Sequence, residues 1–160
     1  MIRVLLPLAI VAAMFFGPMY TYPSDNPVSG HEELRKVPGS DFMGGVIDCV
    51  RKLKVPLGEE CASDGQINGS KTVSHVMSLA AVISLAAAVV GIVGLLPFLG
   101  RITSILTLVS GLSVLGAMGF FVMAMIGTEV GLGAVYWGAY LTAGLALLTI
   151  IVGLSGMRGR

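Results

Sequence analysis

Charge is distributed very unevenly along this chain of 160 residues. Of its ten basic and nine acidic residues, fourteen lie between Tyr22 and Val73, whereas the stretch from Val76 to Met157 contains two, Arg101 and Glu129. A stretch of that length with so little charge cannot form a water-soluble surface. A helix needs about 20 apolar residues to cross the roughly 30 Å hydrocarbon layer of a bilayer. The chain is therefore predicted to be an integral membrane protein.

Four apolar segments are predicted to cross the membrane in a single domain that covers residues 1–160. Their approximate bounds are 4–22, 75–97, 102–126 and 133–156, with a polar loop at 23–74. The short connections on both sides of the third segment require antiparallel helix hairpins. The predicted fold is an all-α, four-helix membrane bundle with a small disulfide-pinned outer loop, in which residues 42–55 alternate enough to form two short strands.

The first segment has an alternative interpretation. Arg3 followed by an apolar run is also typical of a secretory signal peptide. The run is longer than most signal-peptide cores and no small-x-small cleavage site precedes Tyr22, so an uncleaved helix is favoured. Cleavage would leave three spans and place the amino terminus outside.

Basic residues near the ends of spans predict the orientation of a membrane protein. With the amino terminus in the cytoplasm, Arg3, Arg101, Arg158 and Arg160 all lie inside, and the polar loop and Glu129 lie outside. We therefore expect a multi-pass protein of the plasma membrane, with both termini cytoplasmic and the loop extracellular or periplasmic.

The two cysteines, Cys49 and Cys61, both belong to the outer loop. An oxidising compartment favours a disulfide between them, which would close a ring of about 13 residues and stabilise the loop by about 3 kcal/mol. A redox enzyme would be expected to carry a Cys-x-x-Cys pair and a second pair, and a metal site would need His31 or carboxylates at a recognisable spacing. Asn68-Gly-Ser70 fits the acceptor pattern for N-glycosylation.

Small residues recur about every four positions in the three long apolar segments. Such stripes let helix backbones approach closely where lipid provides no hydrophobic drive between helices. They either pack the bundle internally or, for at least one stripe, face a partner protein. The predicted helix-packing residues are Ala80, Ser84, Ala88, Gly91, Thr107, Gly111, Gly138, Thr142 and Ala146. The predicted interfacial aromatic residues are Tyr20, Tyr22, Tyr136, Trp137 and Tyr140.

Groups that could carry catalysis are scarce in the apolar segments. His75 and Glu129 fall at the outer boundary, where solvation explains them. No facing histidine pair for haem, carboxylate dyad or phosphate-cradling glycine loop is visible in the sequence. We therefore expect no enzymatic activity, no cofactor, no bound metal and no nucleic-acid partner.

The run Gly44-Gly-Val-Ile-Asp-Cys49, followed by Cys61, resembles the first extracellular loop of the claudin and peripheral-myelin-protein superfamily, which includes the fungal PalI-type tetraspans. That loop carries a Gly-Leu-Trp-x-x-Cys run and a second cysteine; here Gly45 and Val46 replace Leu and Trp. The stretch from Gly131 to Tyr140 is similar to the entry into the fourth claudin helix. The resemblance implies a left-handed four-helix bundle, topped by a small extracellular sheet.

The leading functional prediction is a non-enzymatic tetraspan that associates laterally with other membrane proteins or with itself, as in claudin-like membrane organisation or adhesion. The alternative is a small accessory subunit of a larger respiratory or photosynthetic complex. A transporter or channel subunit is less favoured because the spans offer so few polar residues for an aqueous path.

Overall fold

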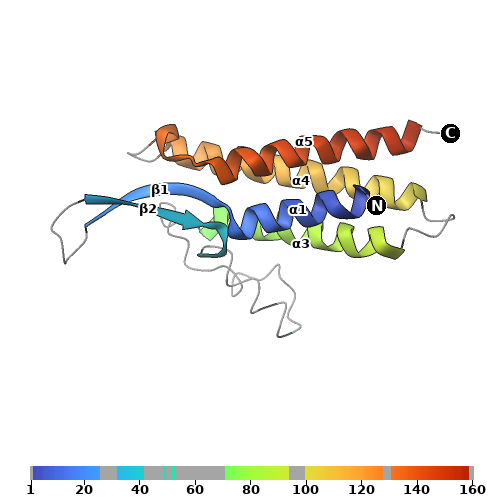
Figure 1. Cartoon of the computed structure of the whole chain (residues 1–160), viewed down its shortest axis with the longest axis horizontal. Coiled ribbons are helices and arrows are strands. Elements are labelled where there is room, and N and C mark those ends of the chain that lie inside the picture. Colours follow the sequence, from blue (N-terminus) through green and yellow to red (C-terminus); the bar gives the residue numbers. More distant parts are fainter. Residues whose placement is uncertain are drawn as a thin grey trace.

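The computed structural model describes residues 2–25, 32–41, 49, 52, 71–93, 100–127 and 131–158. The elements in chain order are α1 (Ile2–Phe16), β1 (Pro18–Asp25), β2 (Glu32–Pro38), α3 (Lys71–Val93), α4 (Gly100–Ile126), the 3-10 helix η2 (Gly131–Ala134) and α5 (Trp137–Arg158). In Figure 1 the α-helices lie side by side as an elongated bundle, and the two strands project from one end of it.

Three of these helices are long and apolar enough to cross a membrane. The crossing segments are His75–Ile92, Ile102–Ile126 and Trp137–Met157. Helix α1 is apolar but has only 15 residues, so it is about 22 Å long at 1.5 Å per residue. The predicted integral membrane character is confirmed by these three helices.

Each helix packs against two neighbours, in the cyclic order α1, α3, α4 and α5, so that α1 and α4 lie across the bundle from each other. Helix α1 begins, and α5 ends, at the same end of the bundle (Figure 1). We call this the arginine end, because Arg3, Arg101 and Arg158 belong to helix termini there. The strands and η2 lie at the other end, which we call the sheet end.

The first helix is shorter than predicted. It ends at Phe16 rather than near residue 22. The Gly17 N–H still donates to the Ala13 carbonyl at 2.9 Å, but Pro18 has no N–H to donate and disfavours helical geometry in the residue before it. The chain therefore changes to strand β1 at Pro18.

The other helix boundaries differ from the prediction by a few residues. Helix α3 begins at Lys71, and residues 94–99 lie outside the described part of the chain. Helix α5 begins at Trp137 rather than near residue 133, because Gly131–Ala134 forms the turn η2. Gly131 opens this turn with a φ of 61°, a conformation that side chains other than glycine rarely adopt.

The sheet forms from residues that the sequence prediction assigned to the first helix and to the polar loop. Strands β1 and β2 are antiparallel, with Tyr20 opposite Val37 and Asp25 opposite Glu32. Pro18 is the first residue of β1 and Pro38 the last of β2, where a missing N–H disturbs the pairing least. The strands predicted in residues 42–55 lie outside the described part of the chain, apart from Cys49 and Lys52.

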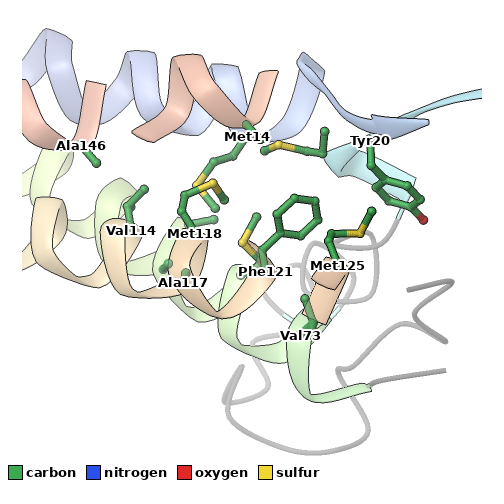
Figure 2. Packing of buried hydrophobic residues seen from close by; sticks show 14 of the residues in the cluster. Met14, Tyr20, Val73, Val114, Ala117, Met118, Phe121, Met125 and Ala146 are labelled. Atoms are coloured by element: carbon green, nitrogen blue, oxygen red, sulfur yellow. The ribbon is translucent and has the colours of Figure 1, made fainter. Parts of the chain in front are cut away.

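The hydrophobic core runs from the bundle into the base of the sheet. Phe121 of α4 is fully buried at its centre, and its ring centroid lies 6.2 Å from that of Tyr20 in β1. Val37 of β2 belongs to the same cluster. Methionines from α1, β1, α3 and α4 belong to the same cluster: Met14, Met19, Met77, Met118 and Met125. Figure 2 shows Met14, Met118 and Met125 near the Phe121 ring.

The predicted small-residue stripes lie inside the bundle. All nine predicted helix-packing residues are buried. A Cβ added at Gly111 of α4 would lie 2.8 Å from Ile150 Cγ1 and 2.9 Å from the Ala146 carbonyl oxygen of α5. Because these nine residues are buried within the chain, the stripes are not exposed as a surface for a partner.

Hydroxyl groups also join the helices inside the bundle. Ser110 Oγ of α4 donates to Ser84 Oγ of α3 at 3.0 Å, and Ser84 Oγ donates to the Ala80 carbonyl at 2.9 Å. Both serines are fully buried. This pair fixes the register of α3 against α4 in surroundings where water cannot replace the lost hydrogen bond.

Gly111→Ala should destabilise the bundle by about 1–3 kcal/mol, because the new methyl group meets backbone atoms that cannot move aside. The measurement is detergent-driven unfolding of the purified chain. The control is Gly116→Ala on the same helix, where a Cβ meets nothing within 4 Å and the bundle should keep its stability. Equal stability of the two variants would contradict the close α4–α5 contact.

A double-mutant cycle of Ser84→Ala and Ser110→Ala should give a coupling free energy of about 0.6 kcal/mol and at most about 1.7 kcal/mol, the range measured for hydrogen bonds between membrane helices. Stability is again read from detergent-driven unfolding. Ser155→Ala on the exposed face of α5 is the control. Its effect on the free energy of unfolding should simply add to the effect of either serine substitution.

Candidate functional site

Among the described residues, the contacts that join distant parts of the chain most specifically lie where the sheet meets the bundle. We call this place the junction and define it as residues 17–21, Lys36 and Val37 of β2, and residues 134–138. The Tyr136 N–H donates to the Met19 carbonyl at 2.9 Å, and Tyr20 forms an antiparallel bridge with Val135. Thr21 Oγ1 donates to the Ala134 carbonyl at 3.4 Å.

These contacts make β1 the middle of three extended segments. Strand β2 pairs with one edge of β1, and Val135, just before α5, pairs with the other. The connection from α4 to α5 is therefore hydrogen-bonded to the strand that follows α1. The sheet is consequently attached to the ends of two different helices.

Two glycines let the backbones meet at the junction. A Cβ at Gly138 would lie 2.8 Å from the Gly17 carbonyl carbon and 2.9 Å from that of Pro18. A Cβ at Gly17 would in turn lie 3.2 Å from the Cα atom of Gly138. The start of α5 thus touches the turn from α1 to β1 with no side chain between them.

Strand β2 has its own contact with the junction. The Lys36 ammonium group lies over the Tyr136 ring, with Nζ 5.1 Å from the ring centroid. A cation above an aromatic face is attracted by the ring quadrupole. Both strands are therefore held to the residues that begin α5.

The outer edge of the sheet is strongly charged. The sequence of β2 includes two acidic and two basic residues, and charge on an edge strand opposes uncontrolled strand pairing. Leu34 is apolar but lies in this charged strand with 71% of its surface exposed, beside Arg35 and Lys36. The attached sheet therefore exposes the apolar Leu34 side chain next to two basic side chains.

Of the two cysteines predicted to form a disulfide, only Cys49 lies in the described residues. Cys49 is buried, at 7% exposed, and its carbonyl accepts a hydrogen bond from the Lys52 N–H at 3.1 Å. The described residues contain no free cysteine thiol. Cys61 lies outside the described residues, as do Asn68, His31 and Glu129.

The predicted aromatic residues separate into two groups. Trp137 and Tyr140 are 54% and 66% exposed at the start of α5, as residues facing lipid headgroups should be, and Tyr136 is half-buried beneath Lys36. Tyr20 is 4% exposed and belongs to the core, so its assignment to the interfacial belt is wrong. The start of β1 turns Tyr20 back over Phe121.

The described part of the chain offers little else for chemistry. It contains no group of three or more His, Cys, Asp or Glu side chains that could hold a metal ion. His75 is half-buried near the start of α3. The junction holds a surface in place and brings no reactive groups together among the residues described.

Sequence reasoning missed most of the junction. The contact between Lys36 and Tyr136 joins residues a hundred positions apart, and no local sequence pattern predicts it. Gly17-Pro18 did carry a signal, because glycine followed by proline marks the end of a helix. Gly138 was predicted to pack against a helix, whereas it meets the turn that leads into β1.

No protein-family model, no curated protein and no solved structure matches this chain.

Gly138→Ala should loosen the junction, because a methyl group there clashes with the Pro18 carbonyl. We expect faster amide hydrogen exchange in β1 and at residues 135–136, with α3 unchanged. The matched control is Gly133→Ala, where a Cβ meets nothing within 4 Å. If exchange in β1 is the same in both variants, the junction does not hold the sheet.

Proposed function

We propose that this protein is a non-enzymatic membrane tetraspan that acts by lateral association with other membrane proteins or with copies of itself. The contact surface is the sheet, together with the disulfide-closed loop that follows it. The junction carries this proposal, since it attaches a sheet that exposes Leu34 beside basic residues to the end of the bundle.

A firmly attached sheet suits recognition. Ordering a loop upon binding costs free energy, and a surface that is already ordered avoids most of that cost. The backbone bond from Tyr136 to Met19, the bridge of Tyr20 with Val135 and the Lys36 contact all restrict the sheet before any partner arrives.

The disulfide is the second restraint in this proposal. Cys49 is buried and is not a free thiol, and Cys61 is the only other cysteine of the chain. A bond between them closes a ring of about 13 residues, which stabilises the loop by about 3 kcal/mol in the chain-entropy model. Such a bond requires an oxidising compartment, in agreement with the loop on the outer side of the plasma membrane.

Leu34 gives the proposed surface an apolar anchor. Protein interfaces are typically organised as an apolar centre surrounded by a polar rim, and a few central residues supply most of the affinity. Leu34 with Arg35 and Lys36 has this composition. The buried small-residue stripes make no contribution to the surface.

The proposed orientation in the membrane rests on the positions of three arginines. Arg3, Arg101 and Arg158 belong to three different helices at one end of the bundle, opposite the sheet. Basic residues are retained on the cytoplasmic side. The sheet then faces outward, which is where a claudin-like protein would present its association surface.

A second candidate, an accessory subunit of a larger membrane complex, is favoured by the length of α1. At about 22 Å this helix is shorter than the roughly 30 Å hydrocarbon layer. A short helix is accommodated by thinning of the bilayer or by association with a neighbouring protein. Extraction in mild detergent followed by native mass spectrometry separates the candidates, since stoichiometric cofactor-bearing partners favour the accessory subunit.

Replacing both Cys49 and Cys61 with serine should weaken association by loosening the loop. The measurement is co-purification of two differently tagged copies of the chain and in-membrane crosslinking to neighbours. Leu34→Ser should weaken the same contacts without affecting the fold. Asp41→Ser, an exposed change close to β2, is the control and should leave association intact. Normal association of both the double variant and Leu34→Ser would overturn the proposal.

A further inference from the structure

Arg3 is the one basic residue of the arginine end whose side-chain contacts the structure describes, and it reaches all three other helices. Its carbonyl oxygen lies 3.6 Å from the position of a Cβ at Gly91 of α3. Its guanidinium group lies against Gly156 of α5, where Ser104 of α4 also approaches. Arg3 is half-buried in this position.

Gly156 makes room for the guanidinium group. A Cβ at Gly156 would lie 2.7 Å from the Arg3 guanidinium carbon and 2.7 Å from Ser104 Oγ, and would overlap a guanidinium nitrogen. The guanidinium and the hydroxyl group therefore lie beside each other at one point, supplied by α1, α4 and α5. We call these three residues the Arg3 seat.

The seat lies about one hydrocarbon thickness along α5 from its aromatic start. Trp137 and Tyr140, exposed at the start of α5, mark the headgroup level at the sheet end. The 22 residues of α5 then span about 33 Å, close to the thickness of the hydrocarbon layer. Gly156 is near the other end of that distance, where the opposite headgroups begin.

The charge around the seat is positive. Arg101 is in the first turn of α4 and Arg158 is the last residue of α5, both at the same end as Arg3. Residues 1–24, 65–128 and 130–160 contain no aspartate or glutamate. The potential at this end therefore favours an anion.

The surroundings of the seat are apolar and exposed. Ile2 and Ile102 are 60% and 52% exposed, and Leu154 and Met157 are 44% and 38% exposed. A free phosphate ion gains nothing from such a surface. A molecule that carries a phosphate at one end and acyl chains at the other fits both features.

We propose that the Arg3 seat binds the phosphate of an anionic phospholipid in the leaflet at the arginine end. The guanidinium fork has five N–H donors and can bind a phosphate with two parallel hydrogen bonds while it keeps a protein contact. The Ser104 hydroxyl is fully buried beside the guanidinium group, on the protein side of the seat, and the exposed apolar residues face the acyl chains.

The test is native mass spectrometry of the full chain in mild detergent, titrated with phosphatidylglycerol and, separately, with phosphatidylcholine. Wild-type protein should retain phosphatidylglycerol preferentially. Arg3→Gln should reduce that retention about tenfold, as expected for losing a hydrogen bond to a charged group. Arg3→Lys should keep only part of the retention. Lysine preserves the charge, but its ammonium group cannot bind a phosphate with two parallel hydrogen bonds.

Two further comparisons locate the site. Gly156→Ala displaces the guanidinium without changing the charge, and should reduce retention of phosphatidylglycerol. Gly144→Ala on the same helix, where a Cβ meets nothing within 4 Å, should not. Arg35→Gln makes the same charge change in the exposed part of the sheet and should also leave retention unchanged.

Results of three kinds would overturn the proposal. The first is equal retention of the two lipids by the wild-type chain, which requires no variant. The second is a loss of retention in Arg35→Gln as large as that in Arg3→Gln, or no loss in Gly156→Ala. The third is displacement of phosphatidylglycerol by inorganic phosphate at similar concentration, which would identify a free-anion site.

Discussion

Helices in lipid must be held together by close steric fit, because lipid tails are as apolar as the side chains that face them. In this chain the fit is made by residues with little or no side chain. Gly111 lies against the backbone of α5, and Gly153 against the backbone of Leu108 in α4. The rest of the structure depends on these approaches, since they set the distance between the long helices.

The same kind of contact continues into the polar part of the molecule. Gly138 meets the Gly17–Pro18 turn as closely as Gly111 meets α5. Helix packing and sheet attachment are therefore one continuous set of backbone contacts. The methionines around Phe121 fill the irregular space between them, which suits a flexible thioether better than a branched side chain.

The buried side chains of α4 differ between the two halves of the bundle. Toward the arginine end, α4 presents buried hydroxyl groups, among them Ser104, Thr107 and Ser110. Toward the sheet end it presents Met118, Phe121 and Met125. Thr107 Oγ1 donates to its own helix, to the Thr103 carbonyl at 2.7 Å, so the hydroxyl is satisfied without widening the bundle. Short polar side chains thus allow tight packing at one end, and large apolar ones support the sheet at the other.

The sequence by itself determined the membrane helices, because burial of about 20 uncharged residues in lipid depends on composition alone. It also pointed to small residues at helical spacing, which the structure buries, although Gly138 among them meets the turn into β1. The end of α1, the sheet in residues 18–38 and the position of Tyr20 were decided by tertiary structure. There, Pro18 stops the helix and distant residues such as Val135 and Lys36 supply the partners. Such partners are brought together by the folded bundle and leave no periodic pattern in the chain.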